Sequence, residues 1–295
     1  MDNEAEECKI TVFLSPTIDL LFKLIFGDAK SVAILIGFLK AVLGLPAEEF
    51  ESIEIVNPHL LQEHLDDKLG ILDLKVKTKK GLTINVEIQV QPRSNFAKRV
   101  SFYQAKMIGE QMGKGSDYSG IQKVVSIIIV DYKLFPDEGH YHSRFTMYDP
   151  KNGRQFSETQ EIHVLELPKL PETEDGTERW GWGKFFKAKS MEELEMTAEM
   201  FPATEIKQAV ARYAELTQDQ KTRMLIEARQ IYEIDRREER DFARREGEAI
   251  GEARGRLEGE ARAMEAAARK ALAGGLSPEA ISSFTGLDIE TIRRL

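Results

Sequence analysis

The chain has almost no cysteine: Cys8 is the only one among its 295 residues. One thiol cannot close a disulfide within the chain or build a thiolate metal cluster. A lone thiol is typical of a reducing compartment, so we expect a cytoplasmic protein.

Long apolar runs are missing as well. No stretch approaches the roughly 20 apolar residues that cross a bilayer, so we expect no membrane partner. The first ten residues, MDNEAEECKI, are acidic and poor in apolar side chains. A secretory signal needs a basic start and an apolar stretch. We therefore expect no signal peptide and interpret residues 1–13 as a flexible tail.

The chain also lacks the basic excess that is usual in nucleic-acid-binding proteins, because its net charge is −9. The acids are unevenly distributed, however. Residues 15–150 contain 16 Lys and Arg against 17 Asp and Glu. This part is near neutral and has room for a local basic strip, so composition neither supports nor excludes DNA binding.

Hydrophobic periodicity predicts a mixed α/β core over residues 14–170. Thr17 is the expected N-cap of the first helix. The run 123–130 is apolar throughout, which indicates a strand buried on both faces. The expected elements are helices at 19–26, 31–42 and 95–112, and strands at 52–56, 70–78, 82–90, 123–130, 142–148 and 161–167.

The expected strands 70–78 and 82–90 form a β-hairpin with two chemically distinct faces. Leucine, isoleucine and valine alternate with polar residues along both strands and predict one buried face. The residues predicted to share the other face are Asp73, Lys75, Lys77, Asn85, Glu87, Gln89 and Gln91.

The second half is expected to be helical, with a helical region at 171–232 and a charged arm at 233–274. Trp180 and Trp182 are interpreted as packing residues. Each interior glycine costs a helix about 1 kcal/mol relative to alanine, which predicts a weakly stable, solvated arm, with self-association as the alternative. The arm's glycines recur every four residues, at Gly247, Gly251, Gly255 and Gly259.

Residues 275–295 predict a small helix-turn-helix-like module, with Ser277 and Asp288 as the caps of two short helices. Arg293 and Arg294 are its main side chains suited to DNA bases. Packing or partner binding is the alternative role for this module.

The acidic residues of the predicted hairpin suggest a metal-ion site. Asp73 and Glu87 lie on the polar face of adjacent predicted strands, where they can converge on one Mg²⁺, an ion that prefers carboxylate oxygens and water. The backbone carbonyl of Ile88 is a further candidate ligand, and Gln89 points to the same side as Glu87. Such a site can hydrolyse a phosphodiester bond. The alternative is that these acids serve solubility.

Four stretches resemble the Rpn family of recombination-promoting nucleases, a branch of the PD-(D/E)xK superfamily whose core has the same αβββαβ order of elements. They are TIDLLFKLIFGD (17–28), ILDLKVKTKKGLTINVEIQVQ (71–91), RVSFYQAKMIGEQMGKGSDYS (99–119) and KVVSIIIVDYKLFP (123–136). The resemblance implies a restriction-endonuclease-like fold with a helical C-terminal extension. It also implies an enzyme dependent on Mg²⁺, or on Mn²⁺, that cleaves DNA.

By this resemblance Asp73 and Glu87 are the two acids of the nuclease motif, and Asp19 matches an acid on the first helix. Gln89 stands where most of the superfamily has lysine, so a positive charge has to come from elsewhere. The candidates for phosphate contacts are Lys75, Lys23, Arg99 and Lys106.

Tyr103 shares a helix face with Arg99 and Lys106 and is expected at the edge of the cleft. A solvated helix face is the alternative for these residues, and a helix-dipole contact is the alternative for Asp19. A subunit with one active site cuts one DNA strand at a time, so cleavage of both strands would favour a homodimer. We expect such a dimer to form through the helical C-terminal region. The rival hypothesis is a catalytically weak nuclease fold that binds DNA or protein.

Overall fold

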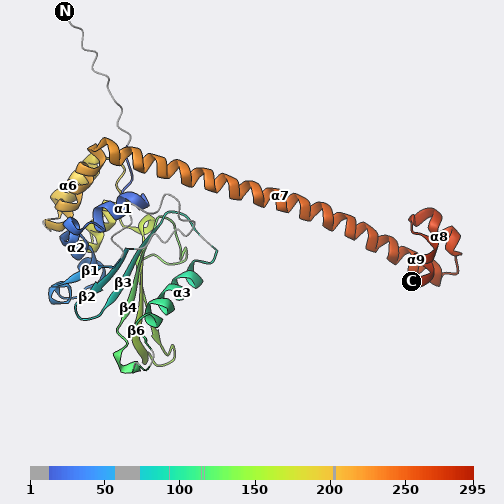
Figure 1. The fold of residues 1–295 in the computed structure, drawn as a ribbon, viewed down its shortest axis with the longest axis horizontal. Helices are drawn as coiled ribbons and strands as arrows, with labels where there is room; N and C mark the ends of the chain where they lie inside the picture. The colour runs from blue at the N-terminus through green and yellow to red at the C-terminus, as the bar shows by residue number, and fades with distance from the viewer. Residues whose placement is uncertain (1–12, 57–73, 93, 114, 116, 202–203) are drawn as a thin grey trace, which may run out of the picture. The chain divides into compact units, whose positions relative to one another are not determined.

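The computed structural model describes residues 13–56, 74–92, 94–113, 115, 117–201 and 204–295 (Figure 1). The chain divides into two compact units, Met1–Glu227 and Ala228–Leu295. Of the predicted flexible tail, only Phe13 is among the described residues.

A six-stranded mixed sheet, in the order β1-β2-β3-β4-β6-β5, forms the centre of the first unit. Strands β3, β4 and β6 are parallel neighbours, and the remaining pairs are antiparallel. The strands are β1 (Ile53–Ile55), β2 (Leu74–Thr78), β3 (Thr83–Gln89), β4 (Val124–Val130), β5 (His142–Tyr148) and β6 (Gln155–Glu166).

The predicted hairpin is present as β2 and β3, paired with Leu74 opposite Val86 and Lys75 opposite Asn85. Gly81 in its turn has φ +94°, a conformation that side chains with a Cβ rarely adopt. Val76, Ile84 and Val86 are fully buried on one face, as alternation predicts. Val90 departs from the pattern and is 48% exposed, because β3 ends at Gln89.

Helices from both halves of the sequence cover this apolar face of the sheet. α1 (Asp19–Phe26) and α2 (Val32–Leu43) pack with α4 (Glu178–Lys187), α5 (Met191–Met200) and α6 (Thr204–Gln218) (Figure 1). A Cβ on Gly37 of α2 would lie 2.4 Å from Cβ of Glu205 on α6, so this close approach requires glycine. Trp180 and Trp182 are each 1% exposed, which confirms that they are packing residues.

The opposite face of the sheet is covered by α3 (Phe96–Gly109) (Figure 1). Its Phe96 and Val100 pack on Ile128 and Val130 of β4 and on Val164 of β6. All seven residues of β4 are buried, which confirms a strand enclosed on both sides. The described elements thus reproduce the order αβββαβ predicted for the core.

Some predicted details are wrong. The N-cap of α1 is Ile18, whose apolar side chain forms no cap hydrogen bond. Thr17, the predicted N-cap, lies one residue earlier, with its hydroxyl 2.7 Å from the Ser15 hydroxyl. α3 ends at Gly109 instead of Met112, and β6 begins six residues before the predicted start.

The second unit contains most of α7 (Gln220–Ala273), which spans the predicted charged arm. α8 (Pro278–Thr285) and α9 (Ile289–Arg294) follow, and Ile281 and Ile292 pack with Ala268 of α7. Ser277 and Asp288 accept cap hydrogen bonds from Ala280 N and Thr291 N, as predicted. No helix in the described part of the chain is long and apolar enough to cross a membrane.

Candidate active site

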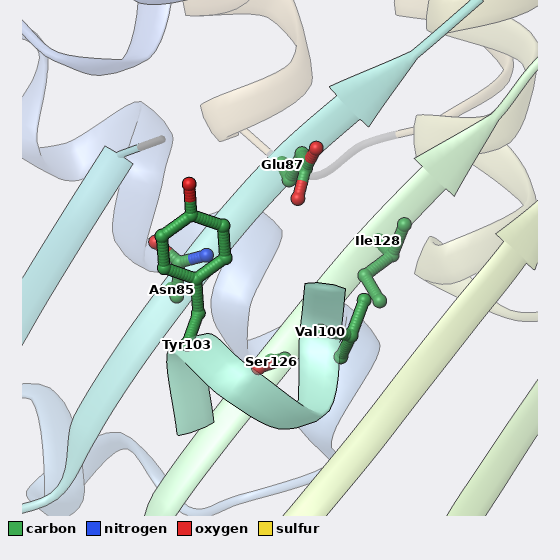
Figure 2. A pocket seen from close by; sticks show the side chains of 6 residues that line it. All are labelled: Asn85, Glu87, Val100, Tyr103, Ser126 and Ile128. Atoms are coloured by element: carbon green, nitrogen blue, oxygen red, sulfur yellow. The ribbon is translucent and has the colours of Figure 1, made fainter. Parts of the chain in front are cut away.

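Three polar side chains project from β3 toward α3. Asn85, Glu87 and Gln89 alternate along the strand and are only 6–7% exposed. Sequence alternation placed them on one face, and α3 covers that face. Figure 2 shows Asn85 and Glu87 on β3 beside Tyr103 of α3, in a narrow pocket that Val100, Ser126 and Ile128 also line.

Glu87 forms an ion pair with Arg99 of α3. Burying a carboxylate without a compensating charge is costly, so the guanidinium stabilises Glu87 in this position. Arg99 also lies over the ring of Tyr103, with its guanidinium carbon 5.9 Å from the ring centroid. One turn of α3 thus supplies both the cation and the aromatic ring beside the acid.

Two buried polar atoms near Glu87 have no hydrogen-bond partner among the described residues: Gln89 Oε1 and Arg99 Nε. Buried polar atoms are normally satisfied, so each marks a place for a further group. Gln89 Oε1 lies on the same strand face as the Glu87 carboxylate. Together these hard oxygen atoms suit a divalent cation or an ordered water.

Lys75 and Lys106 gather at the carboxyl end of α3. Lys75 Nζ lies 2.6 Å from Glu110 Oε2, and Lys106 Nζ lies 3.9 Å from Glu110 Oε1. Lys75 also pairs in register with Asn85, so it lies on the same sheet face as Glu87. The structure therefore brings two predicted phosphate-binding lysines to the pocket side of the sheet. Glu110 holds both, a role that sequence reasoning did not assign.

Lys23 and Asp19 form a salt bridge of 3.0 Å along α1, and Lys23 is 6% exposed. The described contact joins the two residues to each other, so their roles toward phosphate or metal stay predictions. The end of α1 adjoins the hairpin, since a Cβ on Gly27 would contact the Leu74 side chain at 3.4 Å.

The first acid of the predicted motif, Asp73, lies outside the described residues. Ile88, whose carbonyl is the third predicted metal ligand, pairs with Ile129 of β4. The described residues alone contain no group of three His, Cys, Asp or Glu side chains suited to a metal ion. The predicted metal site also includes Asp73, which is not one of the described residues.

A second polar cluster lies on the opposite sheet face, and it was not predicted from the sequence. His142 Nε2 lies 2.9 Å from His163 Nδ1, and His163 Nε2 lies 2.6 Å from Glu161 Oε1. The other Glu161 oxygen accepts from Lys123 at 2.7 Å and from Arg144 at 2.8 Å. These contacts link side chains of β5 and β6 to each other and to Lys123, which directly precedes β4.

Burial shifts the ionisation of this cluster. It raises the pKa of Glu161, but hydrogen bonds from Arg144, Lys123 and His163 outweigh it and hold the pKa at about 2. Burial, together with the nearby Arg179, lowers the pKa of His142 to about 3. The cluster therefore holds an ionised Glu161 and a neutral His142 at neutral pH.

The mixed six-stranded sheet, with α3 covering the Glu87 carboxylate and the Gln89 amide, defines an α/β protein with a nuclease-like order of elements. The family model of the PD-(D/E)XK nuclease family transposases matches residues 16–243, and the chain belongs to this family. Its fold is accordingly the α/β restriction-endonuclease-like fold with a helical C-terminal extension. No curated protein and no solved structure matches the chain.

Proposed function

We propose that the chain is a metal-dependent DNA endonuclease of the Rpn branch of its family, acting in recombination or transposition. The observation that supports this proposal is the β3 strand. Glu87 and Gln89 present a buried carboxylate and a buried amide oxygen without a described hydrogen-bond partner on one face, next to a cation. Family membership and the intact acids of the sequence motif point in the same direction.

In this proposal Asp73, Glu87 and the Ile88 carbonyl hold Mg²⁺ or Mn²⁺. Such an ion lowers the pKa of a bound water and neutralises charge on the scissile phosphate. Gln89 orients the attacking water through its amide oxygen. An amide cannot supply the positive charge that lysine gives most of the superfamily, so turnover is expected to be slow.

Arg99 is the best-placed source of that charge, because its guanidinium already lies against Glu87. Planar guanidinium groups bind phosphate oxygens through two parallel hydrogen bonds. Lys75 and Lys106 extend the cationic side of the pocket, with Lys23 as a more distant contact. Tyr103 supports Arg99 through its ring, and Asp19 supports Lys23.

The proposed partners are DNA and a second copy of the chain, and the proposed location is the cytoplasm. We also propose that residues 14–170 form the nuclease core and 171–232 a helical region. Residues 233–274 would then be the charged arm, and 275–295 an accessory module.

The decisive test is cleavage of supercoiled plasmid in Mg²⁺ or Mn²⁺ by the wild type, Asp73→Ala and Glu87→Ala. We expect nicking by the wild type and a loss of at least about 10-fold in each variant, because even groups that support a metal ligand are worth about 10- to 100-fold. Lys80→Ala is the matched control, because Lys80 is an exposed hairpin residue paired with Glu49. Equal cutting by all variants would refute the site.

One observation favours the rival function, a DNA- or protein-binding module with weak or lost chemistry. Arg99 pairs with the carboxylate that the metal needs. If Arg99 stays paired with Glu87 when metal is present, the fold remains but the Glu87 carboxylate is not available to the metal. Calorimetric titration with Mn²⁺ separates the two proposals. A nuclease binds the ion through Asp73 and Glu87, whereas a pure binding module has no need to bind it.

A further inference from the structure

An apolar stripe runs along α7 within the second unit. Its members are exposed large side chains: Ile231 59%, Phe242 67%, Ile250 62%, Leu257 63% and Met264 44%. At 3.6 residues per turn, these five positions fall within an arc of roughly 100°. An arc of this width is typical of a helix that packs on a partner.

The stability of α7 also points to a partner. Its four interior glycines each cost about 1 kcal/mol relative to alanine. Ion pairs along the helix, such as Arg244 with Asp241 at 3.6 Å, return only a few tenths of a kcal/mol each. Helices in proteins draw most of their stability from packing an apolar face. Yet no described side chain between residues 231 and 264 is buried.

The charges of the arm suggest which partner binds. Residues 228–273 contain 11 Lys and Arg and 11 Asp and Glu, so the segment has no net charge to attract DNA or an acidic membrane. Four acids lie within the stripe at helical spacing: Asp235, Glu239, Glu246 and Glu260. At helical spacing arginines lie along both edges: Arg236 and Arg254 on one side, and Arg245 and Arg256, beside Glu238, on the other. When a second copy packs against this surface, the arginines at the edges of one stripe can therefore meet the acids within the other.

We infer that the apolar stripe of α7 is a dimer interface, and that its occupant is the α7 stripe of a second copy of the chain. The inference extends the pairing of subunits named in the proposed function. The four arm glycines take no part in it, because at helical spacing they fall on the side of α7 opposite the stripe. A Cβ added to any of them would meet nothing within 4 Å.

The test measures the mass of the full chain by light scattering during size-exclusion chromatography, over a range of loading concentrations. The wild type is expected at twice the 33.5 kDa of one chain. The double variant Ile250→Glu/Leu257→Glu is expected at one chain mass, with reduced helical circular dichroism. Both positions are exposed within one chain, so the substitutions leave the folded core intact.

Two matched controls locate the interface. Ile234→Glu makes the same change at a 55% exposed isoleucine off the stripe, and the dimer is expected to persist. Gly251→Ala/Gly255→Ala is expected to remain dimeric and to gain helix stability. A monomeric wild type, or dissociation of either control, would overturn the inference. Dissociation of the glycine variant alone would place the contact on the glycine side.

Assembly and cleavage give separate readouts. A dimer that cuts no DNA contradicts the proposed nuclease and leaves the interface standing. A monomer that cuts DNA contradicts the interface and leaves the nuclease standing. Glu87→Ala, which lies in the first unit, is expected to keep the mass of the wild type.

Discussion

Arg99 and Glu87 meet beneath α3, where Glu87 is almost fully removed from water. Removing one member of such a pair leaves a buried charge, whereas removing both is far less costly. The pair therefore combines a structural role with the proposed phosphate contact. A double-mutant cycle separates the two roles.

We expect Arg99→Met to lower the free energy of unfolding by about 3 kcal/mol, because it leaves Glu87 buried without a counter-charge. The double variant Arg99→Met/Glu87→Gln is expected to recover most of that loss. Urea unfolding of the wild type, Arg99→Met, Glu87→Gln and the double variant completes the cycle. Arg99→Lys keeps the charge but loses the planar fork, so its cleavage is expected to fall at least tenfold while it stays folded. Additive losses in the cycle would rule out a direct pair.

The cluster of His142, His163 and Glu161 determines how acid affects the fold. The pKa of His142 is lowered to about 3, and that of Glu161 to about 2. In both cases the unfolded chain takes up the proton at a higher pH than the folded chain. The stabilisation is thus complete at neutral pH and is lost as pH falls, from about 6.5 to 3 for His142 and from 4.5 to 2 for Glu161.

We expect the unfolding free energy to decrease by up to about 1.4 kcal/mol per pH unit for His142 between pH 6.5 and pH 4. Urea titrations at several pH values measure this slope. His142→Gln is expected to flatten it in part, because His163 also titrates with a lowered pKa. His140→Gln is the matched control, since His140 is exposed and bonded to Glu138. An equal slope in both variants would contradict the assignment.

At the scale of elements, alternation predicted the hairpin well. Period-two spacing fixes which residues share a face, and the observed register keeps Asn85, Glu87 and Gln89 together on β3. Alternation does not show what covers a face. The burial of these side chains comes from α3, whose Phe96 and Val100 anchor it to β4. The ion pair of Glu87 with Arg99 follows from that docking and was not predictable from spacing.

The histidine cluster escaped sequence reasoning for a similar reason. His142 and Arg144 lie on β5, Glu161 and His163 lie on β6, and Lys123 directly precedes β4. The predicted strands 142–148 and 161–167 contained four of these residues, but their patterns did not show that the two strands are neighbours. Each residue alone resembles an ordinary surface group: a lysine, an arginine, a glutamate. Only the parallel pairing of β4 with β6 and the antiparallel pairing of β5 with β6 bring them together.

For the whole molecule, the net charge of −9 makes DNA binding depend on a few cations. Each phosphate contact releases condensed counterions, so the logarithm of affinity falls with the logarithm of salt concentration by about 0.9 per contact. With Lys75, Arg99, Lys106 and Lys23 as the proposed contacts, we expect a slope of about −4 or shallower. That value is modest for a DNA-binding protein.

This electrostatic picture predicts how single lysines change the salt dependence. In a Glu87→Ala background that prevents cleavage, Lys106→Ala is expected to weaken binding of a labelled duplex and to reduce the slope by about one. Fluorescence anisotropy over a salt series measures both quantities. Lys80→Ala removes the same charge at the far end of the hairpin, next to Glu49, and is expected to change neither. If both variants lowered the slope equally, DNA would be responding to overall charge instead of to the α3 side of the sheet, and the cationic pocket would lose its place in the mechanism.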